Sequence, residues 1–306
     1  MFDAINKLFY SMILIIISIC YSQIFHIPFM RKKSFVNRNT IDFIPIVYES
    51  GFKSKLFYTG DFISSGKIDI YTGNHFNYLD FLPHLSLIKN FYEGDIFIIY
   101  SNYIDNIPMI GRWFKHSNNI SVKKKLVDDK EPLLNFIKKV KKGIIFMYPE
   151  GTRITSKKLI KSNEYSKENF NTEFNNLLVP KFKGLHIIIN ELNKNNKLGN
   201  IIDVTMKIEN FGIDNHKIKN IISKKLGKTY CQIVTYKPEP LEDYEMFKSW
   251  FLQIWKVKDF YLNNYQYYQY QQTNFKMKTS VFILDVMVIF IMINIFKFLY
   301  FKKNKF

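Results

Sequence analysis

Two short motifs contain side chains that could carry out chemistry. The first is "NHFNYLD" (74–80), in which His75 lies five residues before Asp80. If these residues formed a continuous helix, five steps would rotate the chain by ~500°, and the two side chains would diverge by ~140°. They can meet only if a turn separates them. We therefore expect His75 in the loop that leaves a strand and Asp80 near the first turn of the next helix.

An Asp80 carboxylate on one nitrogen of His75 would fix the imidazole tautomer and stabilise the imidazolium ion. Such a pair is a general base. No Ser or Cys adjoins it in the motif, so the proton would come from a hydroxyl group of a bound substrate. The alternative is a loop histidine and a helix N-terminal carboxylate that do not interact, which is the usual case for an isolated H-x-x-x-x-D.

The second motif is "YPEGTR" (148–153), which follows an apolar run. Gly151 allows the backbone to approach a ligand closely, Thr152 offers a hydroxyl group, and Arg153 offers a planar fork that suits phosphate. Pro-Glu-Gly is also ordinary turn chemistry, so this motif alone is equally consistent with a plain turn.

Together, the two motifs are far more specific than either one. "NH" followed by Asp80, and then "PEGTR" (149–153), each placed after a strand, resembles the glycerolipid acyltransferases. These enzymes transfer an acyl group from acyl-CoA to lysophosphatidic acid and related lysophospholipids. "LLVPKFKGL" (177–185) is similar to the fourth block of the family, with Pro180 and Gly184 in place. This pattern looks closest to the lysocardiolipin and lysophosphatidylinositol acyltransferase branch.

The second block of the family is where this sequence departs from the pattern. "IPMIGRWFKHSNNISVKKK" (107–125) keeps Gly111 and Trp113, but lysines occupy the place of the usual arginine. Lys124 is the candidate there, and it would pair with phosphate as a point charge rather than a fork. The resemblance covers residues 65–210.

The resemblance implies direct acyl transfer, with His75 as the general base and Asp80 as its partner. Gly151, Thr152 and Arg153 would bind the phosphate of the lysolipid, and Glu150 would orient their loop. Acyl-CoA is a co-substrate, and neither a cofactor nor a metal is implied. An oxyanion donor is needed, and no residue of the sequence is identified as one.

Composition agrees with an anionic partner. The 306 residues carry a formal net charge of +18, which fits nucleic acid, an acidic membrane surface or phosphorylated substrates. The two cysteines, Cys20 and Cys231, form no C-x-x-C motif, so a disulfide framework and a zinc site are not expected. The lysine runs at 123–125 and 138–142 fit a solvated face, which near a bilayer would also attract anionic lipid.

Both ends of the chain indicate a membrane. Leu8 to Met30 contain no charged side chain, which is long enough to span a bilayer; a cleaved signal peptide is the alternative, but no A-x-A-like site follows. The "RKK" at 31–33 predicts that the following domain is cytosolic. Thr279 to Phe296 are apolar except for Asp285, so this segment either spans the bilayer or lies in its interface.

Strand-like and helix-like patterns alternate between these ends. Strands are expected at 67–72, 95–101, 143–149, 201–208 and 229–238, and helices at 78–92, 131–143 and 183–192. The pattern predicts an α/β fold, a central sheet flanked by helices, with membrane helices at the termini. The predicted divisions are an anchor at 1–33, an acyltransferase domain at 40–263, a linker at 264–278, and a hydrophobic segment with a basic tail at 279–306.

Two other functions remain open at this point. A CoA-independent phospholipid transacylase would use the same His/Asp pair. A basic, membrane-tethered binding protein, such as a nucleic-acid scaffold, would explain the charge but not the two motifs, and no nucleic-acid signature is found. We therefore expect acyl-CoA, a lysophospholipid and the bilayer as partners, and no nucleic acid. The histidines without comparable partners are interpreted as structural or surface residues; they are His84, His116, His186 and His216.

Overall fold

The computed structural model describes residues 41–42, 44–46, 48–49, 52, 54–107, 111, 114–115, 117, 119–209, 211–213, 227–237 and 243–274. The two predicted membrane segments, Leu8–Met30 and Thr279–Phe296, lie outside these residues, as do Trp113, His116 and His216. Within the described ranges, no helix combines the length and the apolar character that a membrane span requires.

One sheet organises the described part of the chain. Its eight strands lie in the order β4-β3-β5-β2-β6-β7-β1-β8. The five strands from β4 to β6 run parallel, β7 is antiparallel to β6, β1 is parallel to β7, and β8 is antiparallel to β1. The strands are β1 (Leu56–Gly60), β2 (Ile68–Gly73), β3 (Ile96–Ser101), β4 (Ile120–Val122), β5 (Gly143–Met147), β6 (Leu198–Ile208), β7 (Thr229–Tyr236) and β8 (Gln271–Gln272).

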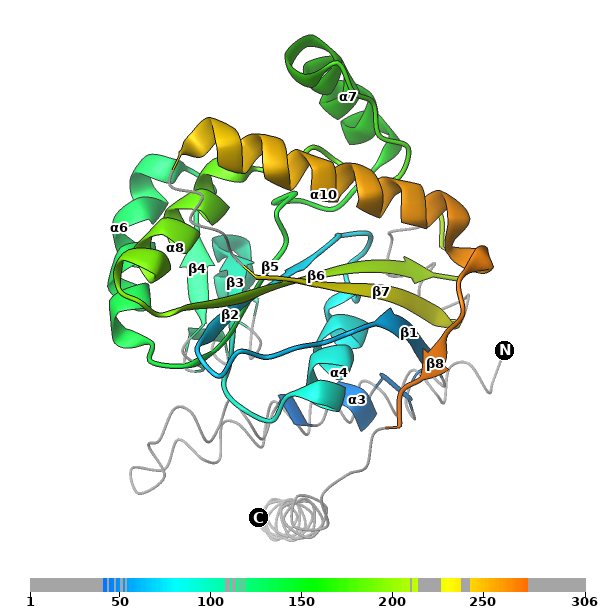
Figure 1. Cartoon of the computed structure of the whole chain (residues 1–306), viewed down its shortest axis with the longest axis horizontal. Helices are drawn as coiled ribbons and strands as arrows, with labels where there is room; N and C mark the ends of the chain where they lie inside the picture. The colour runs from blue at the N-terminus through cyan, green and yellow to red at the C-terminus, as the bar shows by residue number, and fades with distance from the viewer. Residues whose placement is uncertain are drawn as a thin grey trace, which may run out of the picture.

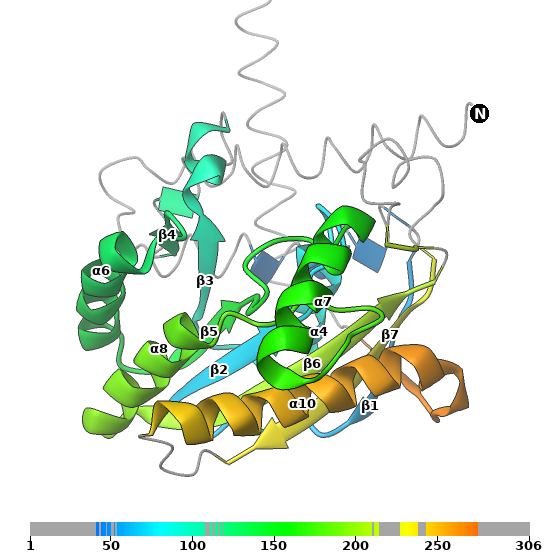
Figure 2. The same cartoon turned by 90° about the horizontal axis from the view of Figure 1, so that it is seen from above.

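Helices cover both faces of the sheet (Figure 1). One face carries α6 (Leu126–Lys139), α8 (Phe182–Lys194) and α10 (Tyr244–Asn264), and the other carries α3 (Ile44–Ile46) and α4 (Phe81–Phe91). A further helix, α7 (Ser156–Phe170), stands out from the α10 side in Figures 1 and 2. Two short 3-10 helices, η3 (Asn102–Asn106) and η4 (Tyr265–Tyr267), follow β3 and α10.

The central strands are buried on both faces. Along β5, Ile144 and Phe146 pack into the core on the α4 side, whereas Ile145 packs into the core beneath α6, α8 and α10. Near-continuous apolar strands of this kind are typical of parallel sheets that helices cover on both sides. The predicted α/β fold with a helix-flanked central sheet is therefore confirmed.

Some elements differ from the sequence-based prediction. Helix α6 begins at Leu126 rather than at Glu131, so Pro132 lies inside the helix. Asp128 and Asp129 lie in its first turn, where carboxylates favour the positive end of the helix dipole, and Asp129 also accepts from the Lys123 amide at 2.7 Å. Part of the expected linker at 264–278 is ordered on the sheet, because it forms η4 and the edge strand β8.

The topology places the loops after β2 and β5 side by side. These strands are parallel neighbours, with Thr72 paired to Met147. The chain leaves β2 through α4 toward β3, and leaves β5 through α7 and α8 toward β6. The two connections therefore run to opposite sides of the β2–β5 pair and cover opposite faces. Such a switch point at the carboxyl edge of a parallel sheet is where α/β folds bind ligands.

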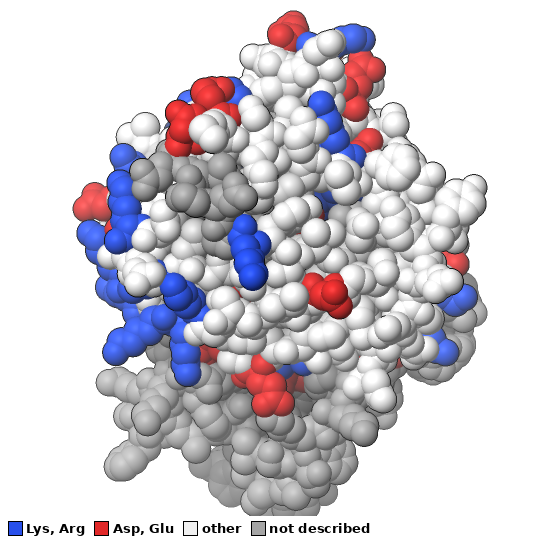
Figure 3. Space-filling view, in the orientation of Figure 1, with Lys and Arg blue, Asp and Glu red and all other residues white. Residues whose placement is uncertain are grey.

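Positive charge is unevenly distributed over the surface. Figure 3 shows Lys and Arg concentrated on the left of this face, the side on which α6 and α8 lie in Figure 1. The lysine run at 138–142 ends directly before β5 begins. It therefore lies at the amino edge of the sheet, opposite the edge where the β2 and β5 loops meet.

Candidate active site

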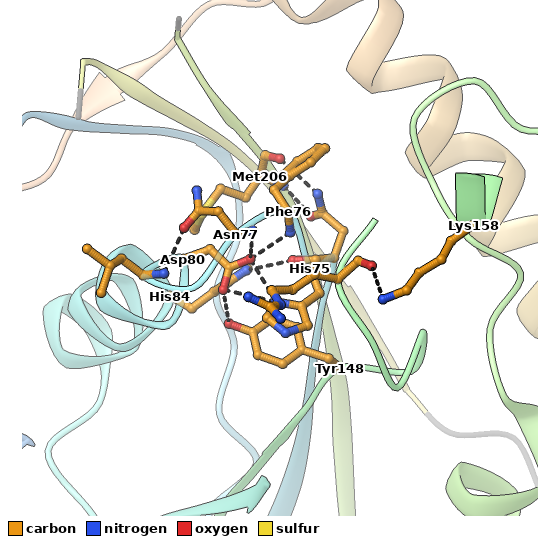
Figure 4. Close-up of polar contacts among 11 residues, drawn as sticks. His75, Phe76, Asn77, Asp80, His84, Tyr148, Lys158 and Met206 are labelled. Carbon is orange, nitrogen blue, oxygen red and sulfur yellow. Dashed lines mark hydrogen bonds and ion pairs between the residues drawn. The ribbon is translucent and has the colours of Figure 1, made fainter. Parts of the chain in front are cut away.

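His75 and Asp80 are in direct contact at the carboxyl end of β2. Nδ1 of His75 lies 2.9 Å from Oδ2 and 3.1 Å from Oδ1 of Asp80 (Figure 4). His75 follows β2 in a loop, and Asp80 directly precedes α4. The Asp80 carboxylate does not cap α4 and instead turns back to the loop. The turn that the spacing required is therefore present, and the two side chains interact.

Asp80 is 1% exposed and is surrounded by donors. Its Oδ2 accepts from the backbone amides of Phe76 at 2.6 Å and Asn77 at 3.1 Å. Burial on its own raises the pKa of Asp80, but His75, then His84 and the Asn77 amide, outweigh burial and hold the pKa below its ordinary value. The carboxylate is therefore ionised at neutral pH. Because it accepts from Nδ1 of His75, that nitrogen carries the proton and Nε2 is left as the basic atom.

Tyr148, which is not predicted as a site residue from the sequence, contacts both members of the pair. Its ring stacks on the His75 imidazole with centroids 4.1 Å apart and an interplanar angle of 12°. Its hydroxyl donates to Oδ1 of Asp80 at 3.0 Å. Tyr148 directly follows β5, so this contact joins the ends of the two neighbouring strands (Figure 4).

Hydrogen bonds to Asn74 fix the loop that carries His75. The side chain of Asn74 donates to the carbonyl of Met206 at 2.9 Å and accepts from its amide at 2.7 Å, which fixes the loop to β6. His84 lies 3.3 Å from the Asn74 carbonyl through Nε2 and 2.8 Å from the Tyr71 hydroxyl through Nδ1. A carbonyl can only accept, so Nε2 of His84 donates and Nδ1 accepts. His84 is thus a buried structural residue, as expected.

The loops after β2 and β5 are also bonded to each other. The Ile154 amide donates to the His75 carbonyl at 3.0 Å. Glu150 is 2% exposed, and the backbone amide of His75 hydrogen-bonds its carboxyl group. Burial raises the pKa of Glu150 well above its ordinary value, against the opposing effects of Lys258 and the His75 amide. Glu150 therefore lies inside the protein, where it links the loop after β5 to the backbone of His75.

The guanidinium group of Arg153 lies over the ring of Tyr78. Its Cζ is 3.2 Å from the centroid of the Tyr78 ring, a close cation–π contact. Nη1 of Arg153 is buried and has no hydrogen-bond partner within the described residues. A buried guanidinium nitrogen without a partner is costly.

Three lysines surround the same loop. Lys158 donates from Nζ to Thr152 Oγ1 at 2.6 Å and to the Arg153 carbonyl at 3.1 Å. The side chain of Lys181 lies against Gly151, which has a φ of +67° and no room to spare for a Cβ, since that atom would sit 3.1 Å from Cδ of Lys181. The positive φ and this close contact both favour glycine at position 151. Neither Lys158 nor Lys181 is predicted as a site residue from the sequence.

Lys124 belongs to the same group. It lies between β4 and α6 with a φ of 65°. Burial, followed by the positive charges of Lys181, Lys158 and Arg153, lowers the pKa of Lys124. Among the residues that the structure describes, no carboxylate forms an ion pair with any of these four cations. The group is therefore an uncompensated positive site next to His75.

Pro180 and Gly184, the two residues of the fourth block, differ in their relation to the site. Pro180 is buried, and its neighbour Lys181 donates its amide to the Pro149 carbonyl at 2.8 Å, which links this segment to the loop after β5. Gly184 lies in the first turn of α8, and a Cβ there would meet no atom within 4 Å. The structure gives no steric reason for glycine at position 184.

The arrangement combines a base and an anion site on one edge. The imidazole of His75 is 21% exposed, and no described residue hydrogen-bonds its Nε2. The loop that carries Arg153 is bonded to the His75 carbonyl through the Ile154 amide, so the cationic group and the base belong to adjoining loops. This geometry suits deprotonation of an anionic alcohol.

Comparison with known proteins agrees with this chemistry. Residues 56–184 match the family model described as Acyltransferase. The chain is 23% identical over 240 residues to 2-acyl-1-lysophosphatidylinositol acyltransferase of Saccharomyces cerevisiae, a match that covers 63% of this chain and 60% of that protein. It is 23% identical over 257 residues to probable 1-acyl-sn-glycerol-3-phosphate acyltransferase 5 of Arabidopsis thaliana, covering 79% of this chain and 66% of that one. The chain thus spans less than two thirds of either relative.

The fold is also found in a solved structure. The 1-acyl-sn-glycerophosphate acyltransferase PlsC of Thermotoga maritima superposes with a TM-score of 0.52 at 14% identity, covering 84% of this chain and 98% of that one. At that identity the likeness concerns the fold alone. The family match spans both the His75–Asp80 motif and the "PEGTR" motif. Residues 56–184 match an acyltransferase domain, and the comparisons support the resemblance of this chain to the glycerolipid acyltransferases.

Proposed function

We propose that this protein transfers a fatty acyl group from acyl-CoA to the free hydroxyl group of a lysophospholipid, with His75 as the general base. The observation that carries the proposal is the contact between His75 and the buried, ionised Asp80, beside an uncompensated cationic site. Such a pair serves a substrate hydroxyl, because no nucleophilic Ser or Cys adjoins His75 in its motif.

The reaction is a direct displacement on the thioester. Nε2 of His75 takes the proton of the lysolipid hydroxyl, and the oxygen attacks the thioester carbonyl carbon. Asp80 stabilises the imidazolium that forms. The tetrahedral oxyanion collapses, the carbon–sulfur bond breaks, and the CoA thiolate recovers the proton from His75. The products are the phospholipid ester and free CoA.

The phosphate of the acceptor binds at the cationic group. Arg153 offers the Nη1 that is left without a partner, and Lys124, Lys158 and Lys181 add positive charge around Gly151. Thr152 accepts from Lys158 and retains its own hydroxyl proton for donation. Fixing the phosphate holds the glycerol hydroxyl near His75, and such positioning contributes substantially to rate.

The acceptor and the acylated product are both lipids, so we place the enzyme at a membrane. The uncharged segment from Leu8 to Met30 and the "RKK" flank support an anchored enzyme whose catalytic domain faces the cytosol. The names of the relatives support acceptors of the lysophosphatidate and lysophosphatidylinositol type.

The test is an acyl-transfer assay on membranes that contain the full-length chain. Labelled acyl-CoA is offered against a panel of lysophospholipids, and labelled phospholipid is offered as an alternative donor. His75→Ala should lower turnover by about 10²–10⁴-fold, the usual contribution of a positioned base. His186→Ala is the matched control, because His186 lies on α8 and contacts Asn190, Tyr244 and Phe247 rather than the site.

Two outcomes would overturn the proposal. Near-normal turnover by His75→Ala would show that His75 is not the general base. Transfer from the phospholipid donor but not from acyl-CoA would identify a transacylase instead.

A further inference from the structure

Tyr148 is the side chain that contacts both halves of the base. Its ring lies nearly parallel to the His75 imidazole, 4.1 Å away, and its hydroxyl donates to Asp80 at 3.0 Å (Figure 4). Tyr148 is distant from Asp80 in sequence and reaches it from the neighbouring strand β5. One residue therefore constrains the imidazole by its ring and the carboxylate by its hydroxyl.

The ring limits the direction of the imidazole. Rotation of His75 out of its present plane would drive the imidazole into the face of Tyr148, because the two planes differ by only 12°. Nδ1 is held on Asp80, so the stacked ring leaves Nε2 directed away from the carboxylate. A leucine at position 148 would fill space but would not impose a plane.

The hydroxyl acts on the charge of Asp80. The carboxylate accepts from four donors, of which Phe76, Asn77 and His75 belong to its own loop and Tyr148 does not. Burial, and then the charge of Asp80, raise the pKa of Tyr148 well above its ordinary value, so the phenol stays protonated and donates. Each neutral donor disperses carboxylate charge that would otherwise act on the imidazolium.

We propose that Tyr148 is a positioning residue that sets both the direction and the proton affinity of His75. The proposal rests on the proposed function, because it concerns the same base. Tyr148 immediately precedes "PEGTR", so its contacts with His75 and Asp80 also join the base to the start of that loop. With the hydroxyl removed, the Asp80 charge would act more strongly on the imidazolium, and the pH profile of the enzyme reports this change.

Other charged groups face His75 and remain in place when Tyr148 changes. Asp80 and His84 approach from α4 and its start, and Glu150 approaches from the loop after β5. The positive charge of Lys258 on α10 lowers the pKa of both His84 and Glu150. A change in pH dependence on replacing Tyr148 therefore reports the lost hydroxyl.

The experiment compares Tyr148→Phe, Tyr148→Leu and wild type by the pH dependence of kcat/KM, which reports the free enzyme. Tyr148→Phe keeps the ring and loses the hydroxyl. We expect the acid limb of the Tyr148→Phe profile to move up by about 0.5–1 pH unit. The shift is this small because only part of the effect of one charged hydrogen bond is passed from Asp80 to the imidazole. KM values for both substrates should change less than about twofold, because no binding group is altered. Tyr148→Leu should in addition lower kcat by at least about tenfold through misdirection of Nε2.

Tyr48→Phe is the matched control. It also removes one buried tyrosine hydroxyl, which bonds Thr229 at 2.5 Å on β7 and does not contact the His75–Asp80 pair. It should cost similar stability and leave the acid limb unchanged. An acid limb of Tyr148→Phe that stays at the wild-type position, or moves down, overturns the claim about proton affinity. Equal kcat for the Phe and Leu variants overturns the claim about direction.

Failure of the proposed function would look different. In that case wild type would show no acyl transfer, or His75→Ala would remain active. Loss of activity in His75→Ala together with an unshifted Tyr148→Phe profile would reject only the role of Tyr148. Thermal unfolding of each variant separates these effects from loss of the fold, and the near-isosteric Phe variant keeps the test available if the Leu variant is unstable.

Discussion

The amide of Ile154 donates to the carbonyl of His75 at 3.0 Å, so the loop that carries the base and the loop that carries Arg153 are one hydrogen-bonded unit. The His75 amide to Glu150 and the Tyr148 hydroxyl to Asp80 add two further links. Backbone damage to either loop should therefore reduce kcat and acceptor binding together. Side-chain substitutions that leave the backbone intact should separate the two.

Asp80→Asn should lower kcat by about 10²–10⁴-fold, comparable with loss of the base, because the imidazolium loses its partner charge. If the Asn oxygen keeps the Phe76 and Asn77 amides, its NH₂ group replaces Oδ1, which accepts from the Tyr148 hydroxyl. At a side chain 1% exposed this should cost about 1–3 kcal/mol of unfolding free energy. Steady-state kinetics and denaturant unfolding measure the two effects. Asp128→Asn, on the exposed start of α6, should change neither, and full activity of Asp80→Asn would contradict the pairing.

Arg153→Lys should raise KM for the lysophospholipid by about tenfold, since it keeps the charge but loses the fork that reaches phosphate. KM for acyl-CoA should change little. A smaller fall in kcat is expected, because a loosely held phosphate lets the hydroxyl move away from His75. The variant also loses the flat contact with Tyr78. Unchanged KM values at normal thermal stability would show that Arg153 does not bind the acceptor.

Lys158→Ala and Lys157→Ala form a matched pair in the first turn of α7. Both remove one exposed positive charge, but only Lys158 contacts Thr152 and the Arg153 carbonyl in the structure. We expect Lys158→Ala to raise KM for the lysophospholipid about three- to tenfold, and Lys157→Ala to stay near wild type at moderate salt. Equal effects of the two changes would indicate a general electrostatic attraction instead of a local contact.

The sequence predicted structure best where the spacing of nearby residues allowed only one local conformation. The spacing of His75 and Asp80 required a turn between them, and that turn is present. The helix expected at 78–92 forms as α4, and Pro83 lies in its first turn, where a missing amide is tolerated. Strand β5 was recognisable as an apolar run between Gly143 and Pro149.

Residues that depend on tertiary neighbours were not predictable. Tyr148 meets Asp80 only because β2 and β5 are adjacent and in register. Lys181 reaches Gly151 because the segment before α8 folds back on the loop after β5. The sequence offered only their positions as a clue: Tyr148 directly precedes the "PEGTR" motif, and Lys181 directly follows Pro180. Helix α7 was missed because its sequence is polar on most sides, and its limits are set by the Thr155 cap and by the left-handed Asn171.

His84 should make the folded protein sensitive to mild acid. It is fully buried, and burial lowers its pKa from 6.5 to about 4, against the opposing effect of Asp80 and the Asn74 carbonyl. The folded-state pKa lies below the unfolded one, so the unfolded chain binds a proton in this window that the folded chain refuses. Stability is therefore complete above pH 6.5 and falls as the pH drops toward 4, by up to about 3 kcal/mol.

His84→Gln tests this, because glutamine does not titrate and can still donate to the Asn74 carbonyl and accept from Tyr71. The measurement is denaturant unfolding of wild type and variant at pH values across the window, compared as a difference. The difference removes other titrating groups, including Glu150, whose raised pKa has the opposite sign and stabilises the fold as the pH falls. The advantage of wild type over His84→Gln should shrink steadily from pH 6.5 to about 4. His186→Gln, on a partly exposed histidine of α8, should leave the slope as in wild type. Parallel slopes for wild type and His84→Gln would show that His84 is protonated in the fold at the same pH as in the unfolded chain.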